Sequence, residues 1–425
     1  MVQIQDSRAY HTISLPLDIP NVKVTQVQQN EWGDYIITVE STLKSTKCQY
    51  CERKLTKLHA CGREIELRHL PILGRRVYIR LRPQQFKCPD CGNKMTTQTL
   101  DWYESNSPHT QAYDEYLMLS LVNSTVEDVS QKERVGYDAV EGAIGRCINT
   151  SVNWAEFTEL SIIGIDEIAL AKGRENFVAL ITTQQAAGRV AVLAVLPDRK
   201  KATVRQFLDS IPKQLRATME TACTDMWEGY VNAVTEFAAA HPEVSIQVVI
   251  DRYHVAKHYR DCVDKVRKRE CRRLKKELST ADYQQITGAM WVVRKNNRDL
   301  TPDERTKLRR LFEYAPELKS AYTFREELTA IFERQLTKDQ AIQRLLKWAG
   351  KVRQTALTCF DSFLTTLNNW LDPIANYFIN RLNSGFVEGL NNKVKTLKRR
   401  CYGLLRVTTL FQRLYLDLEG YRLFA

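Results

Sequence analysis

The order of apolar segments between residues 161 and 255 restricts the fold more than any other feature of the sequence. Three successive strand-like segments are followed by a helical segment, a strand, a second helix and a last strand. Strands that alternate with helices in this way predict a mixed α/β sheet. The seven segments are residues 162–170, 177–183, 189–196, 202–211, 219–225, 229–240 and 246–251.

Carboxylates stand at the centre or the end of three of these strands. Asp166 interrupts an apolar run, and Asp225 and Asp251 end the two later strands. An ionised carboxylate is costly to bury without a partner, and a divalent metal ion is one such partner. The alternative is that each Asp is only the polar end of a strand. Three such aspartates in one sheet favour a cluster of carboxylates on one rim. Glu167 follows Asp166 on the same strand, so its side chain should point to the opposite face and should not bind the same metal.

Two Cys-x-x-Cys pairs stand nearer the N-terminus, separated by a spacer of 36 residues (88 − 51 − 1). Paired thiolates with this spacing are typical ligands of a structural Zn²⁺ ion. Short alternating strands around the pairs predict a small β-rich unit. His59, Cys61 and His69 lie in the spacer and could replace a ligand, although ordinary packing is the simpler role. The predicted zinc ligands are Cys48, Cys51, Cys88 and Cys91.

Residues 108–149 have a helical pattern. Thr125 could cap a helix over residues 126–134, Gly136 could form a turn, and Asp138 could cap a second helix. Such a pair is typical of a helix-turn-helix, which places its second helix in a DNA groove. A plain helical hairpin that links two domains is the alternative.

The chain carries a formal net charge of +12, which favours a polyanionic partner such as DNA. Residues 257–278 form a predicted helix with ten Lys or Arg and four Asp or Glu, and five of the eight residues 393–400 are basic. A solvated helix face without a partner is the alternative. The residues expected to contact DNA are Lys257, Arg267, Lys268, Arg269, Arg272, Arg273, Lys393, Lys395, Lys398, Arg399 and Arg400.

About a hundred residues after this basic helix look wholly helical and interrupt the α/β pattern. Capping boxes are predicted at Thr301 and Thr337, with Glu304 and Gln340 as the reciprocal partners. A further helix from Phe386 would then carry Glu388, Asn391 and Asn392 close together on one side.

These pieces allow phosphoryl transfer with two metal ions. Two divalent cations about 4 Å apart can activate an attacking hydroxyl and stabilise the leaving oxygen of a phosphodiester. Mg²⁺ (or Mn²⁺) suits oxygen ligands, with Asp166 as the bridging residue and Asp225 and Glu388 completing the site. No nucleophile elbow or Walker loop competes with this interpretation.

Four motifs in the sequence resemble those of the DDE transposases of bacterial insertion sequences, and among them most closely the ISL-three family. The resemblance covers nearly the whole chain. It departs mildly from the family before the Glu motif, where this chain has Asn383-Ser384-Gly385. The motifs are Gly164-Ile165-Asp166-Glu167 with Lys172-Gly173, Asp225-Met226 with Tyr230, Asp251-Arg252-Tyr253-His254, and Glu388-Gly389-Leu390-Asn391-Asn392-Lys393-Val394-Lys395 with Lys398-Arg399 and Tyr402-Gly403.

The resemblance implies a multidomain α/β protein. A ribonuclease-H-like DDE domain with an all-α insertion would follow an N-terminal zinc-binding β-rich domain and a helix-turn-helix. The expected boundaries are residues 1–105 for the zinc-binding domain, 106–155 for the helix-turn-helix region, 156–280 for the first part of the catalytic core, 281–375 for the helical insertion, and 376–425 for the last part of the core, which carries the Glu.

The resemblance also implies that the protein binds the terminal inverted repeats of its element, cleaves the ends and transfers the 3′ hydroxyls into target DNA. Asp166, Asp225 and Glu388 would be catalytic. Asp251 would be either a further metal ligand or, beside His254, a supporting or DNA-positioning residue. A homodimer or higher oligomer on double-stranded DNA is expected. An inactive DNA-binding regulator and a structure-selective nuclease on the same fold are the alternatives.

The N-terminus lacks the basic-then-apolar plan of a secretory signal, and no apolar run is long enough to span a bilayer. The sequence therefore predicts a cytoplasmic protein, associated with the nucleoid when bound to DNA and without a membrane partner.

Overall fold

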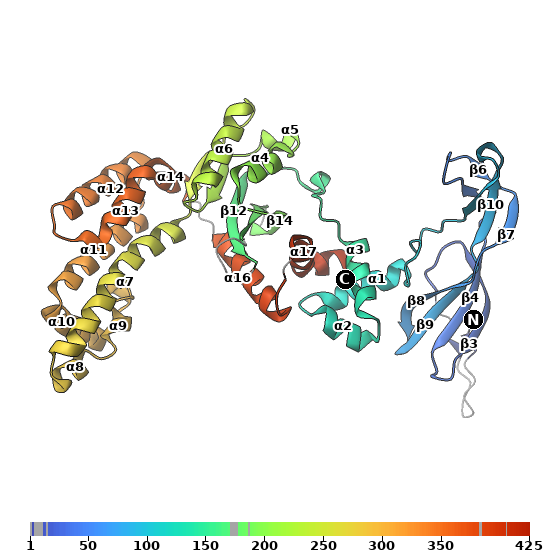
Figure 1. Ribbon diagram of the computed structural model, residues 1–425, viewed down its shortest axis with the longest axis horizontal. Coiled ribbons are helices and arrows are strands. Elements are labelled where there is room, and N and C mark those ends of the chain that lie inside the picture. The colour runs from blue at the N-terminus through green and yellow to red at the C-terminus, as the bar shows by residue number, and fades with distance from the viewer. Residues whose placement is uncertain are drawn as a thin grey trace. The chain divides into compact units, whose positions relative to one another are not determined.

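The computed structural model describes residues 2–3, 12–13, 16–170, 177–185, 188–381, 385–404 and 406–425. The chain divides into two compact units (Figure 1). The first comprises Met1–Asn149 and Gln412–Ala425, and the second comprises Thr150–Phe411. None of the helices in the described ranges is long and apolar enough to cross a membrane.

The first unit begins with β-structure. A four-stranded sheet has the order β3-β4-β9-β8, with β4 and β9 parallel and the other pairs antiparallel. Apolar side chains on alternate positions of β4 and β9 are buried, which explains why period-two patterns in the sequence located these strands. The strands are β3 (Val22–Gln29), β4 (Tyr35–Ser41), β8 (Ile65–Ile72) and β9 (Arg75–Leu81).

A second group of short strands surrounds the cysteine pairs. Its three-stranded sheet has the order β11-β10-β7, and a separate two-stranded ladder joins β5 and β6. A further two-residue pair, β1 (Val2–Gln3) and β2 (Thr12–Ile13), lies near the N-terminus. The strands around the cysteines are β5 (Thr46–Lys47), β6 (Lys54–Leu55), β7 (Leu58–Cys61), β10 (Gln84–Cys88) and β11 (Lys94–Thr97).

Three helices complete this part of the chain: α1 (Gln111–Leu121), α2 (Val126–Glu133) and α3 (Tyr137–Cys147). The predicted cap is confirmed, because the Thr125 side chain accepts a hydrogen bond of 3.0 Å from the Asp128 N–H group. The prediction that Asp138 caps α3 is wrong. Gly136 occupies the cap position without a side-chain bond, and Asp138 lies in the first turn, where its charge complements the helix dipole.

The last helix, α17 (Val407–Phe424), contributes its C-terminal part to the first unit. Leu416 belongs to the same apolar core as Tyr113 and Leu117. Arg413 is 1% exposed and donates to the Ser124 carbonyl at 2.5 Å, beyond the end of α1. This packing places Gln412–Ala425 with the N-terminal helices, whereas the sequence placed all of residues 376–425 in the catalytic core.

The second unit contains the predicted mixed sheet, with strand order β14-β13-β12-β15-β16. β12, β13 and β14 are antiparallel neighbours, and β15 and β16 run parallel to β12. The order of strands and helices along the chain agrees with the sequence prediction, apart from the short helix α5, which was not predicted. The elements are β12 (Ile162–Ala169), β13 (Phe177–Gln184), β14 (Val190–Leu196), α4 (Lys201–Asp209), α5 (Lys213–Arg216), β15 (Thr221–Thr224), α6 (Glu228–Ala240) and β16 (Gln247–Ile250).

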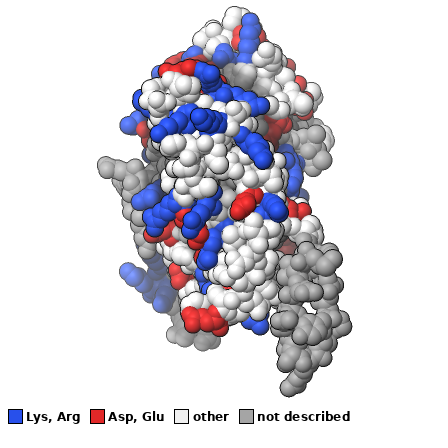
Figure 2. Space-filling model, turned by 90° about the vertical axis from the view of Figure 1, so that its right-hand side faces the viewer, with Lys and Arg blue, Asp and Glu red and all other residues white. Residues whose placement is uncertain are grey.

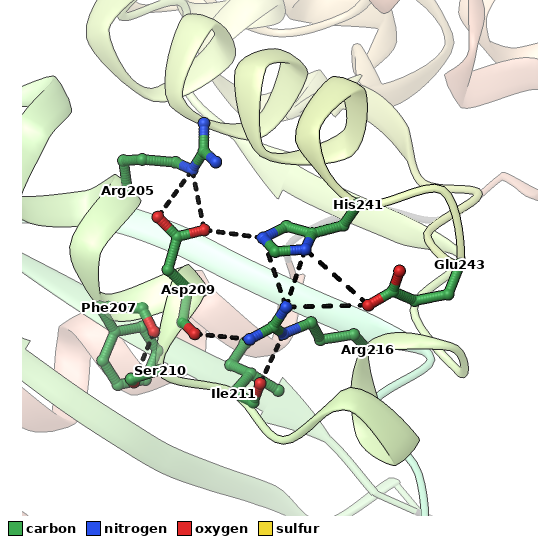
Figure 3. A network of polar contacts seen from close by, with 8 residues as sticks. All are labelled: Arg205, Phe207, Asp209, Ser210, Ile211, Arg216, His241 and Glu243. Carbon is green, nitrogen blue, oxygen red and sulfur yellow. Dashed lines mark hydrogen bonds and ion pairs between the residues drawn. The ribbon is translucent and has the colours of Figure 1, made fainter.

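The helices α4, α5 and α6 are joined at their ends by polar contacts centred on Arg216 (Figure 3). Its guanidinium donates to the carbonyls of Asp209 at 2.7 Å and Ile211 at 2.6 Å, just after α4. It also contacts a ring nitrogen of His241 at 2.8 Å, and the His241 ring reaches the Asp209 carboxylate at 2.9 Å. One side chain therefore satisfies carbonyls at the end of α4 and ties it to the end of α6.

Replacing Arg216 by Ala should destabilise the second unit by about 2 kcal/mol, because buried or partly buried carbonyls lose charged donors. Thermal unfolding of the full chain would measure the change. Lys201→Ala is the matched control, since Lys201 pairs with Glu236 while both side chains are about half exposed (47% and 50%), and such pairs contribute about 0–1 kcal/mol. Equal effects of the two substitutions would contradict the assigned role of Arg216.

After the sheet the chain enters the predicted helical block. α7 (Arg252–Glu277) begins five residues earlier than the sequence predicted, because Asp251 caps it. Both predicted capping boxes, at Thr301 and Thr337, are confirmed. The remaining helices are α8 (Thr280–Ile286), α9 (Ala289–Val292), α10 (Pro302–Tyr314), α11 (Pro316–Glu333), α12 (Lys338–Arg353), α13 (Asp361–Asn369), α14 (Leu371–Ala375), α15 (Tyr377–Asn380) and α16 (Gly385–Arg400).

The block is continuous with one face of the sheet. Its apolar core joins Val249 and Ile250 of β16 to Trp348 and Phe363 of the helices. The other core cluster of the unit contains side chains of α4 and α6 packed with residues of β12, β13 and β14. The sheet is therefore covered by α4 and α6 on one side and is joined to the helical block through α7 and α14.

Candidate active site and zinc centre

The four paired cysteines converge in the first unit. Their sulfur atoms all lie within 4.8 Å of one another, with Cys48 Sγ 3.9 Å from Cys91 Sγ and Cys51 Sγ 3.6 Å from Cys88 Sγ. A tetrahedral zinc ion with Zn–S bonds of about 2.3 Å holds its sulfurs about 3.8 Å apart. The thiols therefore fit Zn²⁺ and would hold it as a closed structural centre.

Hydrogen bonds around Cys48 favour its thiolate form, the form that binds a cation. Burial opposes ionisation of Cys48, but backbone N–H groups of Tyr50 and Cys51 lower its pKa to about 6. The alternative ligands lie elsewhere. His69 is buried with its ring nitrogens bonded to Thr110 and Leu17, and Cys61 is an exposed residue outside the cluster.

The register of the second unit's sheet brings the three aspartates into one row. Ile165 of β12 is paired with Thr224 of β15, and Thr224 with Ile250 of β16. Asp166, Asp225 and Asp251 each follow one of these residues. Because side chains in register on neighbouring parallel strands point to the same face, the row accounts for a cluster that strand patterns alone only suggested.

The surroundings of this row disfavour negative charge. Burial and then the nearby Asp166 raise the pKa of Asp225 to about 6. Burial also raises the pKa of Asp166, against the hydrogen bond from the Glu167 N–H group and the charge of His254. Adjacent carboxylates that oppose each other's ionisation are stabilised by a divalent cation, so Asp166 and Asp225 fit Mg²⁺ or Mn²⁺ as oxygen ligands.

Each of the three aspartates accepts a backbone hydrogen bond, and that of Asp251 caps a helix. The Asp251 side chain accepts a hydrogen bond of 2.9 Å from the Tyr253 N–H group and caps α7. The residue is 5% exposed. The cap gives Asp251 a structural role at the end of β16, while the residue also lines the same cavity as Asp166.

Asp166 and Asp251 line a cavity of about 360 Å³, whose other walls come from the neighbouring residues of β12, the start of α7 and α16. Tyr253 and His254 line it from α7. Asn392, Lys395 and Lys398 line it from α16. The cavity therefore combines acidic residues at one end with cations and a His side chain, a composition that suits a phosphate group beside metal ions.

α16 is tied to β12 by two polar contacts. Asn391 Nδ2 donates to Asp166 Oδ2, and Lys398 Nζ donates to the carbonyl oxygen of Ala169. Burial lowers the pKa of Lys398. The sequence assigned Lys398 to DNA, whereas the structure has it bound to the backbone of β12 at the rim of the cavity.

Glu388 lies on α16 one helical turn before Asn391, in the helix that the sequence predicted. Its side chain is outside the described part of the structure, as are Lys172, Gly173, Asn383 and Ser384. The contact between Asn391 and Asp166 shows that this face of α16 meets the strand that carries Asp166.

Glu167 takes no part in the carboxylate row. It pairs with Arg199 at 2.5 Å, and the Arg199 guanidinium lies over the Trp227 ring at 4.3 Å from its centroid. Glu167 also lines the cavity beside Asp166, so the expectation that it binds no metal there stays a prediction. Sequence reasoning missed Arg199 and Trp227, because neither stands in a motif that signals the contact.

Most cations predicted to bind DNA on α7 are paired with acids of their own unit. Arg267 is 6% exposed and lies 2.6 Å from Asp264, which leaves its guanidinium unavailable to a phosphate. Arg272 is exposed. The other pairs are Lys257–Asp261, Lys268–Asp264, Arg269–Glu317, Arg273–Glu270 and Arg273–Glu277.

Basic side chains are nevertheless abundant on the surface. Figure 2 shows one face, on which blue Lys and Arg side chains spread between scattered red Asp and Glu side chains. On α16, Lys395 and Arg399 are exposed. These residues, unlike Arg267, are accessible to a polyanion.

Comparison with known proteins agrees with this arrangement. Residues 163–414 match a family model described as the ISL-three (ISL3) DDE transposase, and residues 44–99 match a model described as the zinc-finger of transposase IS204/IS1001/IS1096/IS1165. The chain is 25% identical over 385 residues to the transposase for insertion sequence element IS1001 of Bordetella parapertussis, covering 89% of this chain and 91% of the relative.

A second relative is the transposase for insertion sequence element IS1557 of Mycobacterium tuberculosis. It is 23% identical over 367 residues, which cover 81% of this chain and 80% of the relative. The first family match spans more than half of the chain and includes the aspartate row and α16, and the second spans the four cysteines. The chain therefore belongs to the ISL-three family of insertion-sequence transposases.

Proposed function

We propose that this protein binds the terminal inverted repeats of its insertion sequence, cleaves the DNA ends and transfers the 3′ hydroxyls into target DNA. The observation that carries the proposal is the register that aligns Asp166 with Asp225 at the ends of adjacent parallel strands, with Asp166 lining a cavity whose opposite wall is α16. The strand order, three antiparallel strands followed by two parallel ones, supports a ribonuclease-H-like core.

Asp166, Asp225 and Glu388 would hold two divalent cations, Mg²⁺ or Mn²⁺. When bound, such a pair of ions activates the attacking hydroxyl and stabilises the leaving oxygen of the phosphodiester. The protein's own part is to orient the ligands. Asn391 fixes one oxygen of Asp166, and the bond from Lys398 to β12 holds α16 beside that strand.

Lys395 and His254 line the same cavity and would bind the phosphate backbone next to the cleaved bond. A positive charge there offsets that of the phosphate without competing for the metal ions. Asp251 serves in this proposal as the cap that positions the first turn of α7, and with it His254.

DNA-end recognition is assigned to the first unit. We propose that α2 and α3 form a helix-turn-helix with α3 in the major groove, and that the zinc-binding strands contact the adjacent duplex. Bringing two ends together would require a dimer or larger assembly on DNA. The protein would act in the cytoplasm, at the nucleoid.

The test is the wild-type protein with Mg²⁺ and a plasmid that carries the element's two ends. We expect excised element and products joined to a target plasmid, scored by gel and by sequencing of junctions. Cleavage without joined products would favour a structure-selective nuclease. End binding without any cleavage in Mg²⁺ or Mn²⁺ would favour an inactive regulator.

A further inference from the structure

A second cavity, of about 310 Å³, lies on the helical block between α11 and α12. It is separate from the acidic cavity and shares no residue with it. Trp348 forms its floor, since this side chain is 2% exposed and its indole N–H group donates to the Phe324 carbonyl at 2.9 Å. The walls carry Glu327, Arg334, Arg344, Lys347 and Lys351. We call this site the α11–α12 groove.

Charge in the groove is strongly unbalanced. Glu327 is its one acid and is paired with Lys351 at 3.1 Å. Arg334, Arg344 and Lys347 are exposed, and among the described residues no carboxylate forms an ion pair with them. On α7, six cations are paired with acids of the same unit, whereas Arg260, Lys265, Arg272, Lys275 and Lys276 are exposed.

The cations of α12 are spaced for an extended polyanion. Arg344, Lys347 and Lys351 stand at positions i, i+3 and i+7, so they share one face of the helix. Seven residues of helix extend about 10 Å. Phosphates along one strand of duplex DNA advance about 3.4 Å per nucleotide, so the row would extend along about three of them.

We propose that the α11–α12 groove binds the phosphate backbone of duplex DNA and is a DNA-contacting surface of the helical block. The inference rests on the proposed function, which supplies DNA as the substrate. The groove adds a contact that the sequence did not predict, whereas on α7 the expected contacts Lys268, Arg269 and Arg273 are held by Asp264, Glu317, Glu270 and Glu277. A row of cations without base-reading amides should bind DNA with little regard to sequence.

The experiment uses full-length protein and measures the affinity for duplex DNA from 0.05 to 0.3 M salt, with one duplex containing an element end and another unrelated. The variant Arg344→Gln with Lys347→Gln should reduce the slope of log affinity against log salt by about 2, because each lost phosphate contact removes about 0.9. At about 0.1 M salt this corresponds to a loss of roughly 60-fold in affinity.

A matched control removes the same charge elsewhere in the block. Lys307 and Arg309 are exposed on α10 and outside the groove, so Lys307→Gln with Arg309→Gln should leave the slope within about half a unit of wild type. Circular dichroism would verify that both variants are folded. Because the four side chains are exposed, neither pair should change the melting temperature.

An unchanged slope in the groove variant, or an equal loss in the α10 control, would overturn the proposal. Selective binding of an acidic protein by the groove with no change towards DNA would do so as well. If the wild type binds DNA through the groove but never cleaves, the groove assignment stands and the proposed transposition fails. If the wild type cleaves and joins ends but the groove variant has the same salt slope, the proposed transposition stands and the groove assignment fails.

Discussion

Replacing Asp166 by Asn should reduce cleavage of a labelled terminal repeat by roughly 10⁴-fold or more, to background. A neutral carboxamide is a poorer ligand for divalent cations than a carboxylate, so the proposed metal site would lose one of its ligands. Folding should survive, because Asn has the same shape and the buried Asp166 already carries a raised pKa. Binding of the element end should therefore be unchanged, measured by gel shift in parallel with cleavage in Mg²⁺ and in Mn²⁺.

Asp251→Asn is the matched control for this variant, since Asp251 is also a buried carboxylate in the same row of the same sheet. Asn is as good a helix cap as Asp, so the bond to the Tyr253 N–H group is retained while the charge is removed. We expect cleavage within about tenfold of wild type. A loss as large as that of Asp166→Asn would make Asp251 a metal ligand, and undiminished cutting by Asp166→Asn would remove Asp166 from the site.

Local signals in the sequence located the elements of this fold. The order of strands and helices was predictable because the spacing of apolar residues within each segment indicates whether it is a strand or a helix. Thr301 and Thr337 were identified as caps because the capping box lies within four residues. The zinc ligands were identifiable for the same reason, since each Cys-x-x-Cys pair is local and only the meeting of the two pairs requires the fold.

Contacts between distant segments were not predictable. Asn391 and Asp166 are 225 residues apart, and no sequence pattern in either segment predicts contact with the other. The pairing of Arg269 with Glu317 depends on how α7 packs in the helical block, so a count of charges along α7 could not show which cations are paired. The cap at Asp251, unlike these contacts, is a local feature. An Asp immediately before a helical pattern signals a helix start, so the beginning of α7 at Arg252 could have been predicted from the sequence.

Replacing Cys88 by Ser should unfold the zinc-binding strands and reduce binding of the element end by at least about 100-fold. The core of this part is very small, with Cys48, Leu55, Phe86 and Cys88 as its buried members, so apolar burial alone cannot hold it. A structural zinc site contributes roughly 10–16 kcal/mol of binding energy that is realised as folding energy.

Zinc content, protease sensitivity of residues 44–99 and end binding would be measured on the same preparation. Cys61→Ser is the matched control, because Cys61 is an exposed cysteine on β7 of the same strands and lies outside the thiol cluster. It should retain one zinc ion and normal binding. Since the aspartate row belongs to a separate compact unit, Cys88→Ser should also leave the unfolding of the second unit unchanged. A Cys88→Ser protein that keeps its zinc and binds ends like wild type would show that three thiolates suffice.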